Sequence, residues 1–286
     1  MSHTLTSKFN TTERRLVSSF GFLFMGVLSV VILIPFYYLI ASSFKSLGQY
    51  NQVDFQTMWF PQPLHPENYI TAIAQYKFLN YMANSLWLGV VQTSLQVFTS
   101  CVVAYGFSRF KFPGRDVLFV VLLASMMLPT EVTQIPLYQL FRTIGWTNSF
   151  LPLIIPRIFG DAWSIFLLRQ MLLNLPKEID EAAWIDGAGT WKTFLRITLP
   201  QIAPAIVVAA LFGFLGSWKD LFGPLLYLSD SSLYTLPLGL LFFESPTDKL
   251  YTVQLAAVAI ALIPTVIIYL IGNRYFERGI NVTDLK

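Results

Sequence analysis

Five ionisable side chains interrupt long apolar runs of this chain: Glu131, Arg157, Asp161, Lys219 and Asp220. A charged side chain costs a few kcal/mol at the centre of a bilayer, so we expect each to face protein or water rather than lipid. Arg157 and Asp161 are four residues apart on one predicted helix, a spacing that favours an ion pair. Two interpretations stay open at this point: structural ion pairs, or a polar path for a solute.

Trp218, Lys219 and Asp220 are consecutive and would suit a sugar, because an aromatic face stacks on a sugar ring and charged groups bind its hydroxyls. Lys219 and Asp220 lie near the outer end of a predicted span, where a charge reaches water at little cost. Glu131 follows Pro129, which predicts a break in the helix. The candidate substrate-path residues are therefore Glu131, Trp218, Lys219 and Asp220.

A charged, helix-forming stretch, "EIDEAAWIDGAGTWKTFLRITLP", lies at residues 178–200 between two apolar runs. Pro176 suits the first position of a helix, and the acidic residues that follow it favour the helix dipole. Those acidic residues are Glu178, Asp180 and Glu181. Gly187 suits the end of this helix, and Thr190 suits the cap of a second helix that Pro200 ends. The pattern predicts two short helices joined by a tight turn.

The same stretch suits contact with a protein better than contact with lipid. Helices that rest on a lipid surface usually carry Lys and Arg on their polar face, whereas the first half of this stretch is acidic. Acidic residues beside small alanines fit a basic groove of a partner. Both ends of the stretch join predicted membrane spans, so a partner that pushed on it would move two spans together. A helix resting on the lipid surface is the alternative.

Several patterns that carry catalysis or nucleotide binding are missing from the sequence. The two histidines, His3 and His65, lie outside the predicted spans, so no histidine-based metal site is expected. The stretch "DGAGTWKT" has Asp186 and Trp191 where a phosphate-binding P-loop needs glycines. With no GxSxG either, an integral membrane enzyme is a distant alternative. We expect no catalytic residue, metal or cofactor in this chain, so energy for uphill transport must come from an ion or another subunit.

The composition is that of a membrane protein, since 55% of the 286 residues are hydrophobic and only 12% are charged, against roughly 25% charged in soluble domains. A spanning helix needs about 20 mostly apolar residues. The segments that meet this length are residues 19–44, 84–106, 117–141, 149–172, 203–228 and 252–275. The predicted fold is an all-α membrane protein with six transmembrane helices. The net charge of +3 gives no reason to expect a nucleic-acid partner.

Lys and Arg residues gather on one side of these spans, and cytoplasmic loops carry such an excess. With the N-terminus in the cytoplasm, the inside segments hold about three times as many as the outside segments. Those inside are Lys8, Arg14, Arg15, Arg109, Lys111, Arg115, Lys177, Lys192, Arg196, Arg274, Arg278 and Lys286, with Arg169 at a span end. Those outside are Lys45, Lys77, Arg142 and Lys249. We predict a cytoplasmic segment over residues 1–18, a transmembrane domain over 19–275 with an inside loop over 173–202, and a cytoplasmic tail over 276–286.

Small residues recur at every fourth position of the fifth predicted span. They are Ala205, Ala209, Gly213 and Ser217, and they form one face on which another helix can pack closely. Most of the predicted spans contain proline, which bends a helix, either to shape packing or to line a pathway.

The stretch "EAAWIDGAGTWKTFLRITLP" resembles the EAA loop of ABC importer permeases, whose pattern is EAA, three residues, a glycine and then I-x-LP. The positions that match are Glu181, Ala182, Ala183, Gly187, Ile197, Leu199 and Pro200. "DGA", which begins at Asp186, resembles the carbohydrate (CUT1-type) branch of this family, as do "ANSLWLG", "LPTEVTQIPLY" and "WKDLFGPLLYL". Six spans with a short first outside loop resemble the smaller, maltose-type second permease. The resemblance covers nearly the whole chain.

The resemblance implies the type I importer permease fold, in which the EAA loop is a cytoplasmic coupling helix. Glu181 would anchor this helix in a cleft of a separate ATPase subunit. Ala182 and Ala183 would allow close approach, Asp186 would belong to the same contact, and Gly187 would make the turn.

The resemblance also implies a multi-pass protein of a bacterial or archaeal cytoplasmic membrane with both termini inside. It would form a heterodimer with a second permease and assemble with two ATPase subunits, which bind ATP and magnesium, and with an extracytoplasmic sugar-binding protein. The chain would have no enzymatic activity of its own. The tail "ERGINVTDLK" departs from the Gly-rich ending of maltose-type permeases, which speaks against a contact between the tail and the ATPases. The alternative function is an ion-coupled secondary transporter or channel acting alone.

Overall fold

A computed structural model describes residues 11–52, 54–243 and 250–280, and these residues form helices without strands. The chain divides into two compact units. The first comprises Met1–Ala72 and Ser245–Ala259, and the second comprises Ile73–Glu244 and Ile260–Lys286. An all-helical chain satisfies its backbone hydrogen bonds within each segment, as a membrane requires.

The first unit is built on one long helix, α1 (Thr11–Ser43), whose apolar side chains from Phe20 to Ile34 are exposed along the helix, as a lipid-facing span requires. Its proline, Pro35, is contained within the helix. The remaining elements of this unit are α2 (Leu47–Tyr50), α3 (Phe55–Trp59), most of α4 (Glu67–Gln75) and the first turns of α16 (Tyr251–Ile280).

Lys45 fastens the segment that follows α1. Its side chain is 1% exposed, donates to the carbonyl oxygen of Met58 at 2.7 Å and lies over the ring of Tyr38. Asn68 donates to the carbonyl oxygens of Ser43 and Lys45, both at 2.8 Å. Burial lowers the pKa of the Lys45 ammonium, because the charged form loses its hydration. The bond to Ser43 satisfies one of the carbonyl groups that α1 leaves free at its C-terminus, and the other two hold the segment that follows it.

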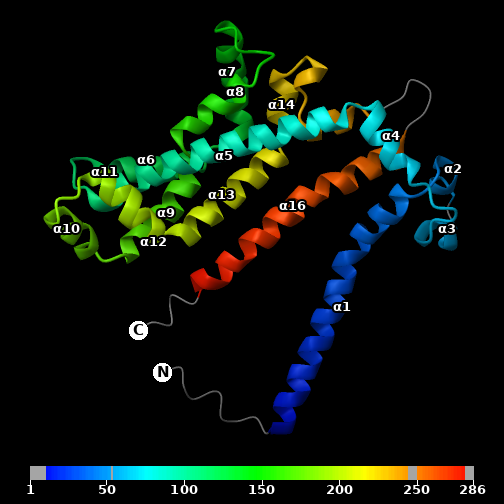
Figure 1. Ribbon diagram of the computed structural model, residues 1–286, viewed down its shortest axis with the longest axis horizontal. Coiled ribbons are helices and arrows are strands. Elements are labelled where there is room, and N and C mark those ends of the chain that lie inside the picture. Colours follow the sequence, from blue (N-terminus) through cyan, green and yellow to red (C-terminus); the bar gives the residue numbers. More distant parts are fainter. Residues whose placement is uncertain (1–10, 53, 244–249, 281–286) are drawn as a thin grey trace. The chain divides into compact units, whose positions relative to one another are not determined.

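The second unit is built around three helices that lie side by side, α5 (Phe78–Arg109), α9 (Ala162–Asn174) and α13 (Ala203–Trp218) (Figure 1). Their shared core contains Val97, Cys101, Ala104, Tyr105, Ile165, Leu168, Leu172, Phe194, Ile202, Ala205 and Ala209. Ala205 and Ala209 are 5% and 0% exposed, and Gly213 brings the backbone of α13 close to Thr93 and Gln96. The prediction that this stripe is a helix-packing face is confirmed.

The two ends of α5 contact different parts of the chain. Near its first turns, Asn80 and Asn84 donate to the carbonyl oxygen of Ser232 at 2.7 and 2.8 Å. The elements that contact this helix from the same part of the chain are η3 (Ser231–Leu233) and α15 (Leu236–Leu241), and α14 (Phe222–Tyr227), which precedes them, packs on the helix over Leu151–Ile154. The helices of residues 178–201 lie at the other end (Figure 1). Beside them, Arg169 of α9 lies over the ring of Phe119 in α6 (Arg115–Ser125), 4.0 Å from its centre.

The predicted count of six spans is not confirmed. By length and composition, the described residues contain four segments that could cross a membrane: Ser19–Ser43, Phe78–Arg109, Leu151–Asn174 and Tyr251–Gly272. A fifth is reached if Thr190–Gln201 and Ala203–Trp218, bent by 82°, are counted as one span. The predicted span over residues 117–141 is divided into α6 and α7 (Thr130–Thr143), each too short to count.

Proline explains this division. Pro129 precedes α7 with an extended backbone (ψ 133°), and it has no N–H to continue a helix from α6. Leu151–Asn174 is likewise a succession of α8 (Leu151–Ile154), a 3-10 turn η1 (Ile155–Phe159) and α9. Gly160, at φ 80°, separates η1 from α9.

Candidate functional site

The predicted inside loop over residues 173–202, called the coupling segment below, is a chain of short helices. They are α10 (Glu178–Ile185), α11 (Thr190–Thr193), a π-helical turn η2 (Phe194–Thr198) and α12 (Leu199–Gln201). Gly187 has φ 80°, and its N–H donates to the carbonyl oxygen of Trp184 at 3.1 Å. The N–H of Ala188 donates to the carbonyl oxygen of Ala183 at 2.9 Å, which completes a glycine-dependent helix end. The predicted end of the first helix at Gly187 is confirmed.

Three finer predictions for this segment are wrong. Pro176 does not begin α10, which starts after Lys177. Gly189, not Thr190, occupies the cap position of α11, and no side chain caps it. Pro200 does not end the second helix, because the helical run continues through η2 and α12 to Gln201 and proline is tolerated in the first turn of α12.

One face of α10 is exposed and mixes acidic with apolar side chains. Its exposed residues are Glu178, Glu181, Ala182, Trp184 and Ile185, followed by Asp186 and Gly187. Ile185 is 86% exposed, an unusual position for a large apolar side chain at the end of a helix. Ala183 and Asp180 are 6% and 2% exposed and point into the protein. Of the residues predicted to couple to an ATPase, Ala183 therefore supports the helix from beneath.

Among the described side chains, the predicted substrate-path residues Trp218, Lys219 and Asp220 lie in three different settings. Trp218 is 7% exposed and stacks on Phe214, with ring centres 5.7 Å apart. Lys219 is exposed at the end of α13. Asp220 accepts a hydrogen bond from the N–H of Gly223 at 3.1 Å and so fastens the start of α14. Glu131 belongs to α7, but its side chain lies outside the described residues.

The predicted ion pair between Arg157 and Asp161 does not form. Arg157 donates from Nη1 to Oε1 of Gln96 at 3.1 Å. Asp161 accepts at Oδ2 from the N–H and the hydroxyl of Ser164, both at 2.9 Å, and so caps α9. The i, i+4 argument fails because Gly160 interrupts the helix between the two residues.

Arg157 and Asp161 instead line a cavity of about 470 Å³, called the polar pocket below. The pocket is lined by Gln96, Arg157, Asp161, Trp163, Phe212, Gly213 and Gly216, which come from α5, η1, α9 and α13. The rings of Trp163 and Phe212 meet edge to face with centres 4.9 Å apart. Aromatic surface beside a few fixed polar groups is typical of a small-molecule site.

A hydrogen-bond network holds the polar side of this pocket. Gln96 is 4% exposed, accepts from Arg157 and donates from Nε2 to the hydroxyl of Ser164 at 3.3 Å. Ser100 accepts from the N–H of Asp161 at 3.1 Å. A guanidinium has five N–H donors, so Arg157 keeps further donors for a ligand beside the one that binds Gln96.

The sequence marks Arg157 and Asp161 as unusual but does not indicate the pocket that they line. Gln96, Trp163 and Phe212 lie on three helices, and no local rule brings them together. The available signal was Trp163, which follows Asp161 by two residues at the start of an apolar helix.

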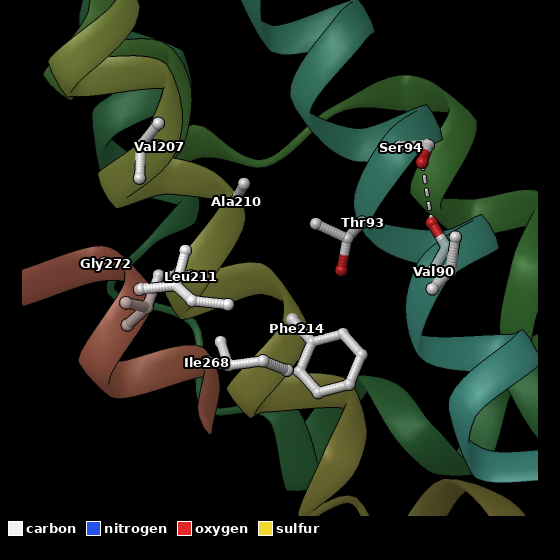
Figure 2. Close-up of a pocket in the computed structure, with 10 residues that line it drawn as sticks. Val90, Thr93, Ser94, Val207, Ala210, Leu211, Phe214, Ile268 and Gly272 are labelled. Atoms are coloured by element: carbon white, nitrogen blue, oxygen red, sulfur yellow. Dashed lines mark hydrogen bonds between the residues drawn. The ribbon is translucent and has the colours of Figure 1, made fainter. Parts of the chain in front are cut away.

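A second cavity of about 280 Å³, between α5, α13 and α16, is different in chemistry (Figure 2). Val207, Leu211, Phe214 and Ile268 line it with carbon, and the only hydrogen bond drawn there joins Ser94 to the carbonyl oxygen of Val90 at 2.7 Å. Such a surface suits apolar chains and offers a sugar little to bind.

Residues 96–282 match the family described as the binding-protein-dependent transport system inner membrane component. This match covers well over half of the chain, including the coupling segment and the polar pocket. The chain belongs to this family.

Two relatives and one solved structure resemble the chain over most of its length. The arabinooligosaccharides transport system permease protein AraQ of Halalkalibacterium halodurans is 30% identical over 93% of this chain and 94% of its own. The probable ABC transporter permease protein YurM of Bacillus subtilis is 31% identical over 93% of this chain and 87% of its own. A crystal structure of a bacterial ABC transporter involved in the import of alginate is similar in fold, with a TM-score of 0.83 and 20% identity over 94% of this chain and 99% of that chain.

Proposed function

We propose that this chain is a membrane permease subunit of an ATP-driven importer for a sugar or oligosaccharide. The observation that carries the proposal is the similarity, over 93% of the chain, to a permease named for arabinooligosaccharide transport. A permease named for diacetylchitobiose uptake in Streptomyces coelicolor is 30% identical over 88% of the chain. The two named substrates share carbohydrate chemistry but differ in sugar type, so the proposal stops at the class.

In this proposal α6 and α7 together make a sixth crossing, and both termini lie in the cytoplasm of a bacterial or archaeal cell. The excess of Lys and Arg on that side supports the orientation. The broken backbone between α6 and α7 is tolerated in a membrane where it is buried in protein or lines a water-filled path.

The exposed face of α10 is proposed to dock in a cleft of an ATPase subunit. Glu181 and Asp186 would contact basic groups there, Ala182 would allow close approach, and Gly187 would set the turn. Trp184 and Ile185, exposed beside them, would supply the apolar part of the contact. ATP and magnesium would be bound by two such ATPase subunits, and this chain would contribute no catalytic residue.

The polar pocket is proposed to contact the transported sugar. Trp163 and Phe212 offer ring faces and edges to a pyranose, while Arg157 and Gln96 offer donors and acceptors to its hydroxyls. Lys219 and Asp220 at the end of α13, and Glu131 of α7, would belong to the approach to this pocket. Trp218 would not contact the sugar, because it stacks on Phe214, which lines the apolar cavity and not the polar pocket.

The remaining partners are a second permease, which would complete the path as a heterodimer, and an extracytoplasmic sugar-binding protein. One structure of similar fold is that of a bacterial alginate ABC transporter in complex with an alginate pentasaccharide-bound periplasmic protein, which supports a partner of this second kind. The alternative is a carrier driven by an ion gradient. Such a carrier has no ATPase subunit, so it would leave the exposed acidic and apolar face of α10 unexplained.

Reversing the charge of Glu181 tests the docking. Glu181→Lys should reduce the amount of ATPase subunit that co-purifies with the chain by more than about tenfold, because like charges brought together at an interface cost several kcal/mol. Asp116→Lys is the matched control, since Asp116 is 78% exposed on the predicted cytoplasmic side but outside the coupling segment. Equal co-purification of both variants with the wild type would contradict the proposed docking.

A further inference from the structure

Asp180 differs from its acidic neighbours in the coupling segment because its side chain is turned inward. Glu178 and Glu181 are exposed, whereas Asp180 is 2% exposed and cannot reach a partner protein. Burying a carboxylate costs several kcal/mol unless it is paired and hydrogen-bonded. Because Asp180 is buried, its carboxylate needs partners within the chain.

Two partners meet this carboxylate from different elements. Nε of Arg109, the last residue of α5, lies 2.5 Å from Oδ2 of Asp180, and the two side chains are 3% and 2% exposed. The hydroxyl of Thr198, the last residue of η2, donates to Oδ1 at 2.6 Å. Arg109 also donates from Nη1 to the carbonyl oxygen of Leu175 at 3.3 Å, just before α10. One buried carboxylate thus joins α5, α10 and η2.

The contact of α5, α10 and η2 around Asp180 is called the joint below. Aromatic side chains pack on its apolar side. Tyr105, one turn before Arg109 on α5, lies against Phe194 of η2 with ring centres 5.0 Å apart. Both residues are almost completely buried. The coupling segment is therefore held to α5 by a charged contact and an apolar contact on the same helix end.

Helix α5 leads from this joint to the polar pocket. Arg109 and Gln96 lie on the same unbroken helix, about 20 Å apart at 1.5 Å per residue. A buried ion pair cannot slide without exposing or orphaning a charge, so it fixes the position of α10 relative to α5. It is a poor source of net stability, because well-packed apolar residues often replace such a pair at no cost. Its presence is therefore better explained by the way it positions α10 against α5 than by a gain in stability.

We propose that the buried ion pair of Arg109 and Asp180, with Thr198, is the link that transmits movement of the coupling segment to α5 and so to the polar pocket. The proposal rests on the proposed importer function. Arg109 and Asp180 are positioning residues in it: they touch neither the ATPase nor the sugar. They make movement of α10 and movement of α5 a single event.

The test compares two variants in vesicles that hold the complete complex. Asp180→Asn keeps the size of the side chain and removes its charge. The double variant Arg109→Met with Asp180→Leu replaces the pair by apolar side chains that restore packing. We expect both to retain the co-purified ATPase, and we expect sugar uptake per ATP hydrolysed to fall about tenfold or more in both, since an unpaired or missing charge no longer fixes the joint.

The double variant separates a link from a merely structural pair. If the pair only stabilises the fold, the apolar replacement should restore both the thermal transition and uptake per ATP to wild-type values, and the proposal would be overturned. If the double variant does not fold, wild-type uptake per ATP in the isosteric Asp180→Asn would overturn the proposal equally. The exchanged pair, Arg109→Asp with Asp180→Arg, should recover part of the lost coupling.

Failure of the importer function itself would look different. In that case the wild-type chain would retain no ATPase, and Glu181→Lys would change nothing. Loss of uptake per ATP with the ATPase still bound belongs to the proposed link alone.

Discussion

Gly216 gives the polar pocket a wall without a side chain. A Cβ placed there would meet no atom within 4 Å, so the space beside it is open. Gly216→Phe should therefore leave α13 intact while its ring enters the pocket. We expect sugar uptake into vesicles to fall by roughly tenfold or more, because a ligand needs the volume that the ring would fill. The ATPase should still co-purify.

The matched control is Gly26→Phe in α1, where a Cβ also meets nothing within 4 Å. Both substitutions add the same ring to a long helix, but Gly26 does not line the polar pocket. Uptake should be close to wild type in this control. Normal uptake by Gly216→Phe would remove the pocket from the sugar's path.

At the scale of the element, the end of α10 depends on a residue with positive φ. Gly187→Val would place a β-branched side chain at φ 80°, which costs about 1–2 kcal/mol. We expect the end of α10 to fray, and both ATPase co-purification and sugar uptake to decrease. Circular dichroism of the purified chain should change little, since only one short helix is affected.

Gly189→Val is the control for that change. Gly189 has φ −68°, and a Cβ there also meets nothing within 4 Å, so the substitution adds the same side chain without backbone strain. If the two variants behaved alike, the positive φ of Gly187 would not be what shapes the docking face.

Some features that follow from local chemistry could be predicted from the sequence, although the helix starts expected at Pro176 and Thr190 were misplaced by one or two residues, and features that depend on distant contacts could not be predicted. Gly187 marks the end of α10, and the small residues of α13 mark its packing face, because each depends on the residues nearby. The pairing of Arg157 with Asp161 failed because Gly160 adopts a conformation that breaks the expected helix. The polar pocket depends on three helices meeting, which periodicity within one helix does not report.

At the scale of the whole molecule, the crossing made by α6 and α7 is the part of the topology that most needs a test. In a Cys101→Ser background, Arg142→Cys should react with a membrane-impermeant thiol reagent added outside intact cells, because Arg142 is exposed at the end of α7. Lys111→Cys, exposed just after α5, should react only after the membrane is opened. If Arg142→Cys also needed an opened membrane, α6 and α7 would form a re-entrant hairpin and the six-span topology would be wrong.

Transport of sugar by this chain should occur only within an ATP-driven complex. The decisive measurement is uptake of labelled oligosaccharides into vesicles that contain the chain with its co-purified partners, with ATP inside and the binding protein outside. We predict uptake that requires both ATP and the binding protein and persists when ionophores collapse the ion gradients. Uptake by the chain alone, without ATP and driven by an ion gradient, would contradict this function and establish the carrier alternative.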